Sequence, residues 1–236
     1  ITAEPGYVVT FQAILHPDGS VLYQYLSMEG SVDGATVGLQ NGTGEIGVTI
    51  AHNEPFIHDS LAVLIDVGVG THVRGTIAEN TTWTQQGSPY RIQSAPTVPT
   101  LVTLTIEPGV DVLFDIDEPF VVDGAIHAVG TAVDSIRFMN GTATEWGGIR
   151  FSGGDTSTFA YARISDGAAN ACCSGANGGG AYIADAQTRV AFINSVISGN
   201  SALSYGGGVH NESGSVAFLD CRIEGNSATS DGGGLR

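Results

Sequence analysis

An internal repeat constrains the fold of this chain more than any other feature. Residues 190–202 read VAFINSVISGNSA, and residues 216–228 read VAFLDCRIEGNSA, an offset of 26 residues. A glycine triplet follows each copy, at 206–208 and 232–234, and 178–183 is a looser copy of that part. A fixed period in this range with strand-like content is typical of a solenoid, in which each repeat packs only on its neighbours.

The repeat favours a three-sided parallel β-helix, because the Leu/Asn consensus of leucine-rich repeats is absent. Equivalent residues of successive coils would then lie about 4.8 Å apart. We expect a ladder of stacked amides at Asn200 and Asn226, and glycine at the sharp corners. We also expect three apolar stacks: Val190 on Val216, Phe192 on Phe218 and Ile197 on Ile223.

Three segments differ in character along the chain. Residues 1–67 contain short β-type runs at 7–15, 21–26, 35–40, 47–51 and 61–66. The first two flank His-Pro-Asp-Gly at 16–19, which is a hairpin signal, so this segment is predicted to be antiparallel. Residues 68–100 are polar and proline-containing, and they are predicted to be a linker and N-terminal cap. Residues 101–236 show the solenoid pattern, with room for about five or six coils.

Composition excludes several functions. The chain has 24 Asp and Glu residues against 8 basic residues, all of them Arg, and a formal net charge of −16. Such a surface repels nucleic acid and anionic lipid, and the absence of Lys excludes a Schiff base or a P-loop. No apolar run reaches 18 residues, so no membrane span is predicted.

Several features indicate an extracellular or cell-surface protein. The chain is acidic, rich in Gly, Thr, Ser and Asn, and it carries four sequons that are candidate glycosylation sites, at Asn41, Asn80, Asn140 and Asn211. The first residues lack the pattern of a signal peptide, so either one was removed or the chain is an internal stretch.

The three cysteines leave their redox state open. Cys172 and Cys173 are adjacent and are candidates for a vicinal disulfide; a bond to Cys221 and three unpaired thiols are the alternatives. The odd number allows at most one internal disulfide.

Candidate catalytic chemistry is weak in the sequence. No carboxylate pair or Asp–Arg cluster recurs one repeat apart, and no His pair has metal-ligand spacing, so we predict no catalytic residue and no cofactor. Calcium is the one metal candidate, at Asp115, Asp117 and Glu118. The alternative for these carboxylates is solvation of strand surfaces.

Some of these motifs resemble a known group of proteins. TLTIEPG at 103–109, the run at 122–131, WGGIRF at 146–151 and the ISGNSA repeats resemble secreted bacterial right-handed parallel β-helix proteins. The GGGV and VAFIN units resemble repeats of polymorphic outer-membrane adhesins and autotransporter passengers. Residues 8–66 resemble the second half of a β-sandwich of large exported bacterial proteins. The resemblance implies an all-β chain, with a partial antiparallel β-sandwich followed by a right-handed parallel β-helix.

The expected function is structural or adhesive, as in a subunit of a cell-surface fibre or coat. The alternative is a polysaccharide-binding or polysaccharide-degrading lyase or hydrolase, because the same fold carries both classes. Both ends look incomplete in the sequence, so we expect end-to-end self-association. A polysaccharide or a host or cell surface is the other expected partner.

Overall fold

The computed structural model describes residues 8–15, 21–29, 36–40, 47–52, 58–65, 70–170 and 176–236. The chain divides into two compact units, Ile1–Val69 and Gly70–Arg236. Both are built from β-strands, which confirms the predicted all-β class. The described residues contain one short 3-10 helix, η1 (Gln85–Gly87). No helix in these ranges is long and apolar enough to cross a bilayer.

The first unit contains antiparallel strands. β1 (Val8–Leu15) pairs with β2 (Val21–Glu29), and β2 pairs with β5 (Ala62–Ile65). β3 (Thr36–Gln40) pairs with β4 (Gly47–His52). Tyr25, Val37 and Val63 form a small core between these strands. The expected turn at 16–19 lies outside the described residues.

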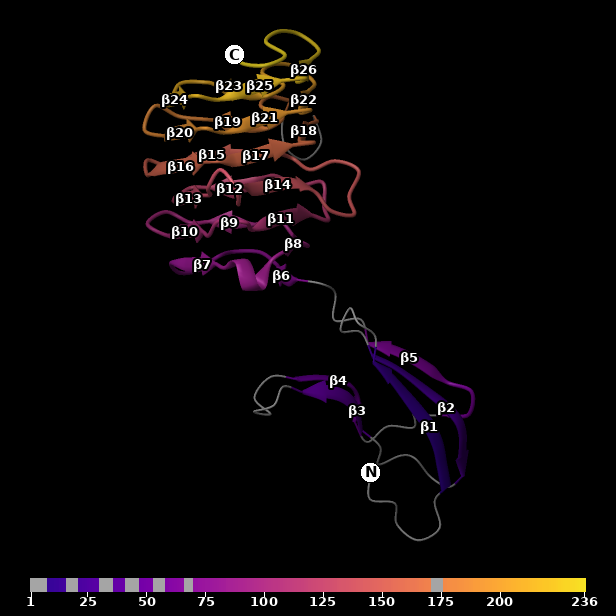
Figure 1. Ribbon diagram of the computed structural model, residues 1–236. Helices are drawn as coiled ribbons and strands as arrows, with labels where there is room; N and C mark the ends of the chain where they lie inside the picture. Colours follow the sequence, from indigo (N-terminus) through magenta and orange to yellow (C-terminus); the bar gives the residue numbers. More distant parts are fainter. Residues whose placement is uncertain are drawn as a thin grey trace. The chain divides into compact units, whose positions relative to one another are not determined.

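The second unit consists of parallel sheets (Figure 1). The six-stranded sheet contains β7 (Thr81–Trp83), β10 (Thr103–Ile106), β13 (Ala125–Val129), β16 (Thr156–Ala160), β20 (Arg189–Ile193) and β24 (Ser215–Leu219). The seven-stranded sheet contains β6 (Thr71–Val73), β8 (Tyr90–Ile92), β11 (Asp111–Phe114), β14 (Ile136–Asn140), β17 (Ala162–Ser165), β21 (Val196–Ser198) and β25 (Arg222–Glu224). The five-stranded sheet contains β9 (Thr97–Val98), β12 (Phe120–Val122), β15 (Ile149–Phe151), β19 (Ala181–Ile183) and β23 (Val209–Asn211). The small parallel sheet contains β18 (Ala168–Ala169), β22 (Ser201–Ala202) and β26 (Ser227–Ala228).

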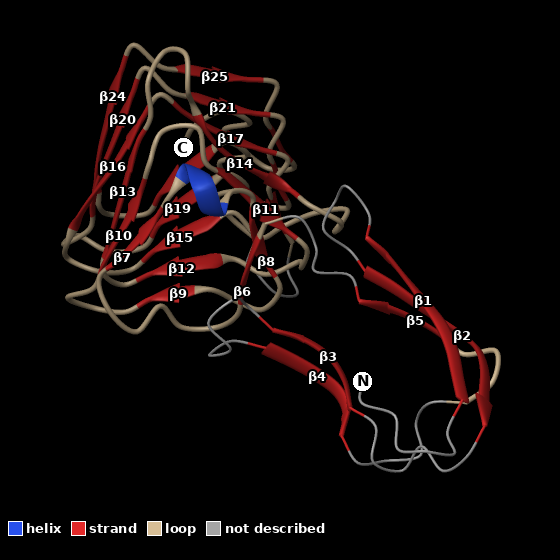
Figure 2. Cartoon of the chain, turned by 60° about the horizontal axis from the view of Figure 1, so that its bottom comes forward, coloured by secondary structure: helices blue, strands red, loops and turns tan. Residues whose placement is uncertain are grey.

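The chain visits these sheets in a fixed order. From β7 onward each round passes the six-stranded sheet, then the seven-stranded sheet and then the five-stranded sheet, and from β18 onward it also passes the small sheet between the last two. Figure 2 shows the strands of each sheet stacked along one side of this unit. Each strand between the first and last rounds therefore pairs with strands one round earlier and one round later, without a local hairpin.

The predicted stacking of the two repeat copies is confirmed. Val190 pairs with Val216, Phe192 with Phe218 and Ile197 with Ile223 in parallel register. The Phe192 and Phe218 rings are stacked, with centroids 5.4 Å apart. The amide Nδ2 of Asn200 donates a hydrogen bond of 2.9 Å to Oδ1 of Asn226, as expected for an amide ladder.

Residues 68–100, expected as a linker and N-terminal cap, contain strands of the parallel sheets. β7, β8 and β9 pair in register with β10, β11 and β12, and β6 pairs with β8. These strands have only two or three residues, too few for a hydrophobic pattern to stand out between prolines. The Trp83 and Tyr90 rings lie inside this first round, stacked with centroids 4.6 Å apart.

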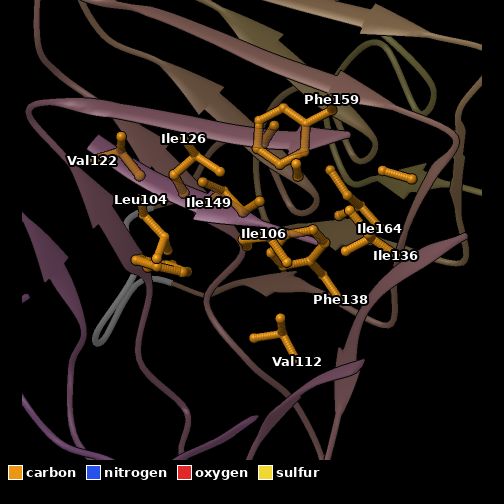
Figure 3. Close-up of a cluster of buried hydrophobic side chains, with 14 of the residues drawn as sticks. Leu104, Ile106, Val112, Val122, Ile126, Ile136, Phe138, Ile149, Phe159 and Ile164 are labelled. Carbon is orange, nitrogen blue, oxygen red and sulfur yellow. The ribbon is translucent and has the colours of Figure 1, made fainter. Parts of the chain in front are cut away.

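One continuous core fills the space between the parallel sheets. Its side chains alternate with outward ones along each strand, as in β11, where Val112 and Phe114 are buried and Asp111 and Leu113 are not. Figure 3 shows the aliphatic and aromatic side chains of several rounds packed together, among them Leu104, Phe138 and Phe159.

The glycine triplets allow the backbones of successive rounds to approach closely. The amide of Gly207 donates to the carbonyl of Gly232, and the amide of Gly208 donates to that of Gly233. A Cβ atom on Gly207 would lie 2.0 Å from the carbonyl oxygen of Ser227. Only glycine fits there, which explains why the triplet is part of the repeat.

Candidate functional site

A column of planar side chains lies on the outward side of the five-stranded sheet. Arg150, Tyr182 and His210 occupy equivalent positions of β15, β19 and β23, because the strands pair in parallel register. The Arg150 guanidinium carbon lies 4.1 Å from the centroid of the Tyr182 ring. The Tyr182 and His210 rings are parallel within 8°, with centroids 5.5 Å apart. These contacts combine a cation–π interaction with ring stacking.

Two further residues extend this column. Tyr205 precedes the turn at Gly206, which has a φ of 63°, and its ring stacks on His210 with centroids 6.0 Å apart. The guanidinium carbon of Arg236 lies 3.5 Å from the centroid of the Tyr205 ring. We call Arg150, Tyr182, His210, Tyr205 and Arg236 the planar stack. Both tyrosines thus have their faces in contact with other members of the stack.

Glu212 joins the planar stack by hydrogen bonds. Its Oε2 accepts a bond of 3.1 Å from the Tyr182 hydroxyl and lies 3.3 Å from Nε2 of His210. Because a carboxylate can only accept, this contact assigns the proton of His210 to Nε2. The hydrogen bonds from His210 and then Tyr182 lower the pKa of Glu212. Burial, followed by the Glu212 hydrogen bond, raises the pKa of Tyr182.

A polar pocket of about 320 Å³ lies beside the planar stack. It is lined by Asn177, Tyr205, His210, Asn211, Glu212 and Arg236. The amides, carboxylate and guanidinium could bind hydroxyl groups of a polar ligand. The buried Nδ1 of His210 has no hydrogen-bond partner. However, the ring faces that a sugar would stack on are covered within the planar stack.

The calcium candidates have other partners. Both oxygens of Asp115 accept hydrogen bonds from the Arg91 guanidinium, at 2.8 and 3.0 Å, and Oδ1 also accepts from the Thr142 amide. Asp117 accepts a bond of 3.0 Å from Nδ2 of Asn170. Glu118 is half-buried and follows the bend at 116–117, two residues before β12. The described residues contain no group of three or more acidic, histidine or cysteine side chains placed to hold a metal, and the calcium site stays a prediction.

The modification candidates lie in different settings. Asn80 is exposed, and its Oδ1 accepts a bond from the Thr103 amide. Asn140 and Asn211 are half-buried, and their Nδ2 atoms donate to the carbonyls of Thr144 and Gly214. Cys221 has a free thiol, which donates to the Leu219 carbonyl at 3.3 Å. The remaining candidates lie outside the described residues: Asn41, Cys172 and Cys173.

Comparisons with protein-family models, with curated proteins and with solved structures return no match to this chain. What the planar stack can do therefore follows from its own geometry and charges.

The planar stack was not predicted from the sequence, although a signal for it exists. Tyr182, His210 and Arg236 each stand two residues after a glycine triplet. This position faces outward beside the corner, so a planar side chain recurring there indicates a column. Apolar and glycine positions define the repeat, whereas a column of Tyr, His and Arg shares neither size nor charge.

Proposed function

We propose that residues 70–236 form a right-handed parallel β-helix and that the chain is an extracellular structural or adhesive protein, such as a subunit of a cell-surface fibre or coat. The fixed order in which the chain visits the parallel sheets supports the fold. Short strands in register with those of the next round are what a coil of three or four sides would produce.

The observation that carries the functional proposal is the pairing of outward polar and aromatic groups with one another. Arg91 pairs with Asp115, and Arg137 with Asp111, each across neighbouring strands of one sheet. The two tyrosines of the planar stack are covered by its other members. A polysaccharide groove would instead present open ring faces and paired carboxylates, so this surface favours a rigid rod over a catalytic cleft.

Most aromatic side chains of the second unit serve its interior rather than its surface. The fully or nearly fully buried ones are Trp83, Tyr90, Phe114, Phe120, Phe138, Trp146, Phe151, Phe159 and Phe192. This distribution supports a structural role, because apolar area buried in the core stabilises the rod and is not available to a ligand.

The proposed location is the cell surface or the surrounding medium, and the acidic composition, with 24 Asp and Glu residues and no Lys, supports it. Antibodies raised against the chain should label intact, unpermeabilised cells of the source organism. Cells lacking the chain should show reduced attachment or an altered surface layer. Labelling that appears only after permeabilisation would contradict this location.

A second candidate function is polysaccharide binding or cleavage, and the polar pocket beside the planar stack favours it. Glu212 and Arg236 contribute a carboxylate and a guanidinium to its lining. Incubation with neutral and acidic polysaccharides should release no reducing ends or unsaturated products if the structural proposal is correct. Product release, or retention on an immobilised polysaccharide that Glu212→Gln abolishes, would favour the second candidate instead.

End-to-end self-association, predicted from the sequence, stays a prediction. For an adhesive rod, we also expect binding to a polysaccharide or to a host or cell surface.

A further inference from the structure

Asn80 is an exposed sequon asparagine that directly precedes β7. Its Oδ1 accepts a hydrogen bond of 2.9 Å from the Thr103 amide, which holds the carboxamide in one orientation. Its Nδ2 makes no hydrogen bond to any residue that the structure describes. Thr82 completes the sequon, and its side chain is exposed at the outward position that pairs with Thr105. The two side chains that define this sequon are therefore both open to solvent.

The other sequons in the described part of the chain use the same nitrogen inside a turn. Nδ2 of Asn140 and Nδ2 of Asn211 donate to main-chain carbonyls of their own turns, at 2.8 and 3.1 Å. Both side chains are half-buried, and Oδ1 of Asn140 is fully buried. A sugar on either nitrogen would need room beside a half-buried turn. A sugar on Asn80 replaces one solvent-facing hydrogen and leaves the bond from its Oδ1 to Thr103 in place.

We propose that Asn80, rather than Asn140 or Asn211, carries an N-linked sugar chain in the native protein. The pattern Asn-x-Ser/Thr is the acceptor for such sugars on the surface of exported proteins. Nδ2 attacks the anomeric carbon of a glycosyl donor activated by phosphate, so a C–N bond forms and the bond from that carbon to the phosphate oxygen breaks. Nδ2 loses one proton, and the phosphate group leaves with the bonding electron pair. The proposal rests on the proposed function for its extracellular setting.

Mass spectrometry of the full chain purified from its source organism tests this site. Trypsin cleaves after Arg, and the chain has no Lys, so each of the three sequons falls in a peptide of its own. The sequons of Asn80, Asn140 and Asn211 lie in peptides 75–91, 138–150 and 190–222. Peptide 75–91 should carry the added sugar mass, whereas the other two should appear at their unmodified masses. An unmodified 75–91 peptide would overturn the proposal, and so would equal modification of all three peptides.

Two variants of Thr82, expressed in the source organism, separate modification from folding, because this side chain is exposed and lies outside the core. Thr82→Ala removes the sequon hydroxyl and should abolish the sugar, although Asn80 itself is unchanged. Thr82→Ser keeps a hydroxyl and should keep the sugar. Asn140→Gln is the matched control at a second sequon and should leave the modification of peptide 75–91 as it is in the wild type.

Persistence of the sugar in Thr82→Ala, or its loss from both Thr82 variants, would also overturn the proposal. These results leave the proposed cell-surface location intact, because labelling of intact cells tests that location separately. Labelling only after permeabilisation would contradict the location, and a sugar found on Asn80 would still stand.

Discussion

At the scale of single residues, the amide ladder places a fully buried polar side chain between two rounds. Asn200 is 1% exposed. Its Oδ1 accepts from the Gly167 amide at 2.9 Å, and its Nδ2 donates to Asn226 and to the Ile164 carbonyl. These three bonds reach neighbouring strands or turns, and a fourth, from Nδ2 to the Ser198 carbonyl at 3.2 Å, is local. The side chain therefore fixes the register as well as satisfying buried groups.

Replacing Asn200 with Ala should therefore be costly, about 1–3 kcal/mol for each buried group left without a partner. Asn226→Ala should cost less, because Asn226 is only half-buried and water can replace part of its bonding. Denaturant unfolding of both variants measures the difference. If both variants lost the same free energy of unfolding, the stabilisation from each Asn side chain would not depend on how deeply that side chain is buried.

The two stacked phenylalanines should differ in the same way. Phe192 is fully buried, whereas Phe218 is only partly buried against the core. Phe192→Ala should lower the free energy of unfolding by about 3–5 kcal/mol, and Phe218→Ala should lower it by less. A loss below about 0.5 kcal/mol for Phe192→Ala, typical of surface changes, would contradict its place in the core.

Glu212 should make stability depend on pH. Its pKa is lowered in the folded chain, chiefly by the hydrogen bond from His210, so the ionised form stabilises the fold. That contribution is complete above the ordinary carboxyl pKa of about 4.3 and is lost as the pH falls through the lower, folded-state value. The difference in unfolding midpoint between wild type and Glu212→Gln should thus shrink on acidification. A difference that stays constant from neutral to acidic pH would contradict the proposed bonding.

At the scale of elements, the glycine triplets and the short strands depend on each other. Gly207→Ala would place a Cβ atom 2.0 Å from the Ser227 carbonyl oxygen. The backbone that carries this oxygen cannot move away without breaking its hydrogen bonds to the neighbouring round. At Gly154 the nearest atom to such a Cβ is the Gln187 Cβ at 3.5 Å, an ordinary contact. Gly207→Ala should lower the thermal midpoint by several degrees and Gly154→Ala should leave it nearly unchanged. Equal midpoints would mean that the triplets are not needed for close stacking.

Repetition decided which of these strands could be predicted from the sequence. The two closest copies share period, apolar positions and turn residues, so the stacking of Phe192 on Phe218 followed directly from the sequence. Residues 71–98 repeat nothing recognisable, because one inward position accepts Trp83, Ile106 or Ala128 alike if the volume is filled. Strands there became visible only through their backbone pairing.

The candidate site was harder to predict than the fold. Arg150, Tyr182 and His210 share no chemical class, and what unites them is planarity and an equivalent outward position. A sequence pattern built on hydrophobicity does not detect such a column. Conversely, Asp115 and Asp117 are close in sequence, but the former is bonded to Arg91 and the latter to Asn170.

At the scale of the whole molecule, the second unit grows in length by one strand spacing per round. Each round adds about 4.8 Å along the stack, whatever the sequence of that round. In such a stack of strands, stability comes from contacts between neighbouring rounds, and the outward faces are free to differ. The planar stack lies on one such face, the outward side of the five-stranded sheet.

Distances between pairs of spin labels along one column test the central claim of parallel stacking most directly. Cysteines at Thr82 and Ala217, in a chain whose three native cysteines are replaced by Ser, label strands at the two ends of the six-stranded sheet. Five strand spacings separate these positions, so the backbones should lie about 24 Å apart, and labels at Thr105 and Ala191 should lie about 14 Å apart. Pulsed electron paramagnetic resonance should show that the first distance exceeds the second by about 10 Å. Equal distances for the two pairs, or a first distance shorter than the second, would contradict the stacked parallel fold.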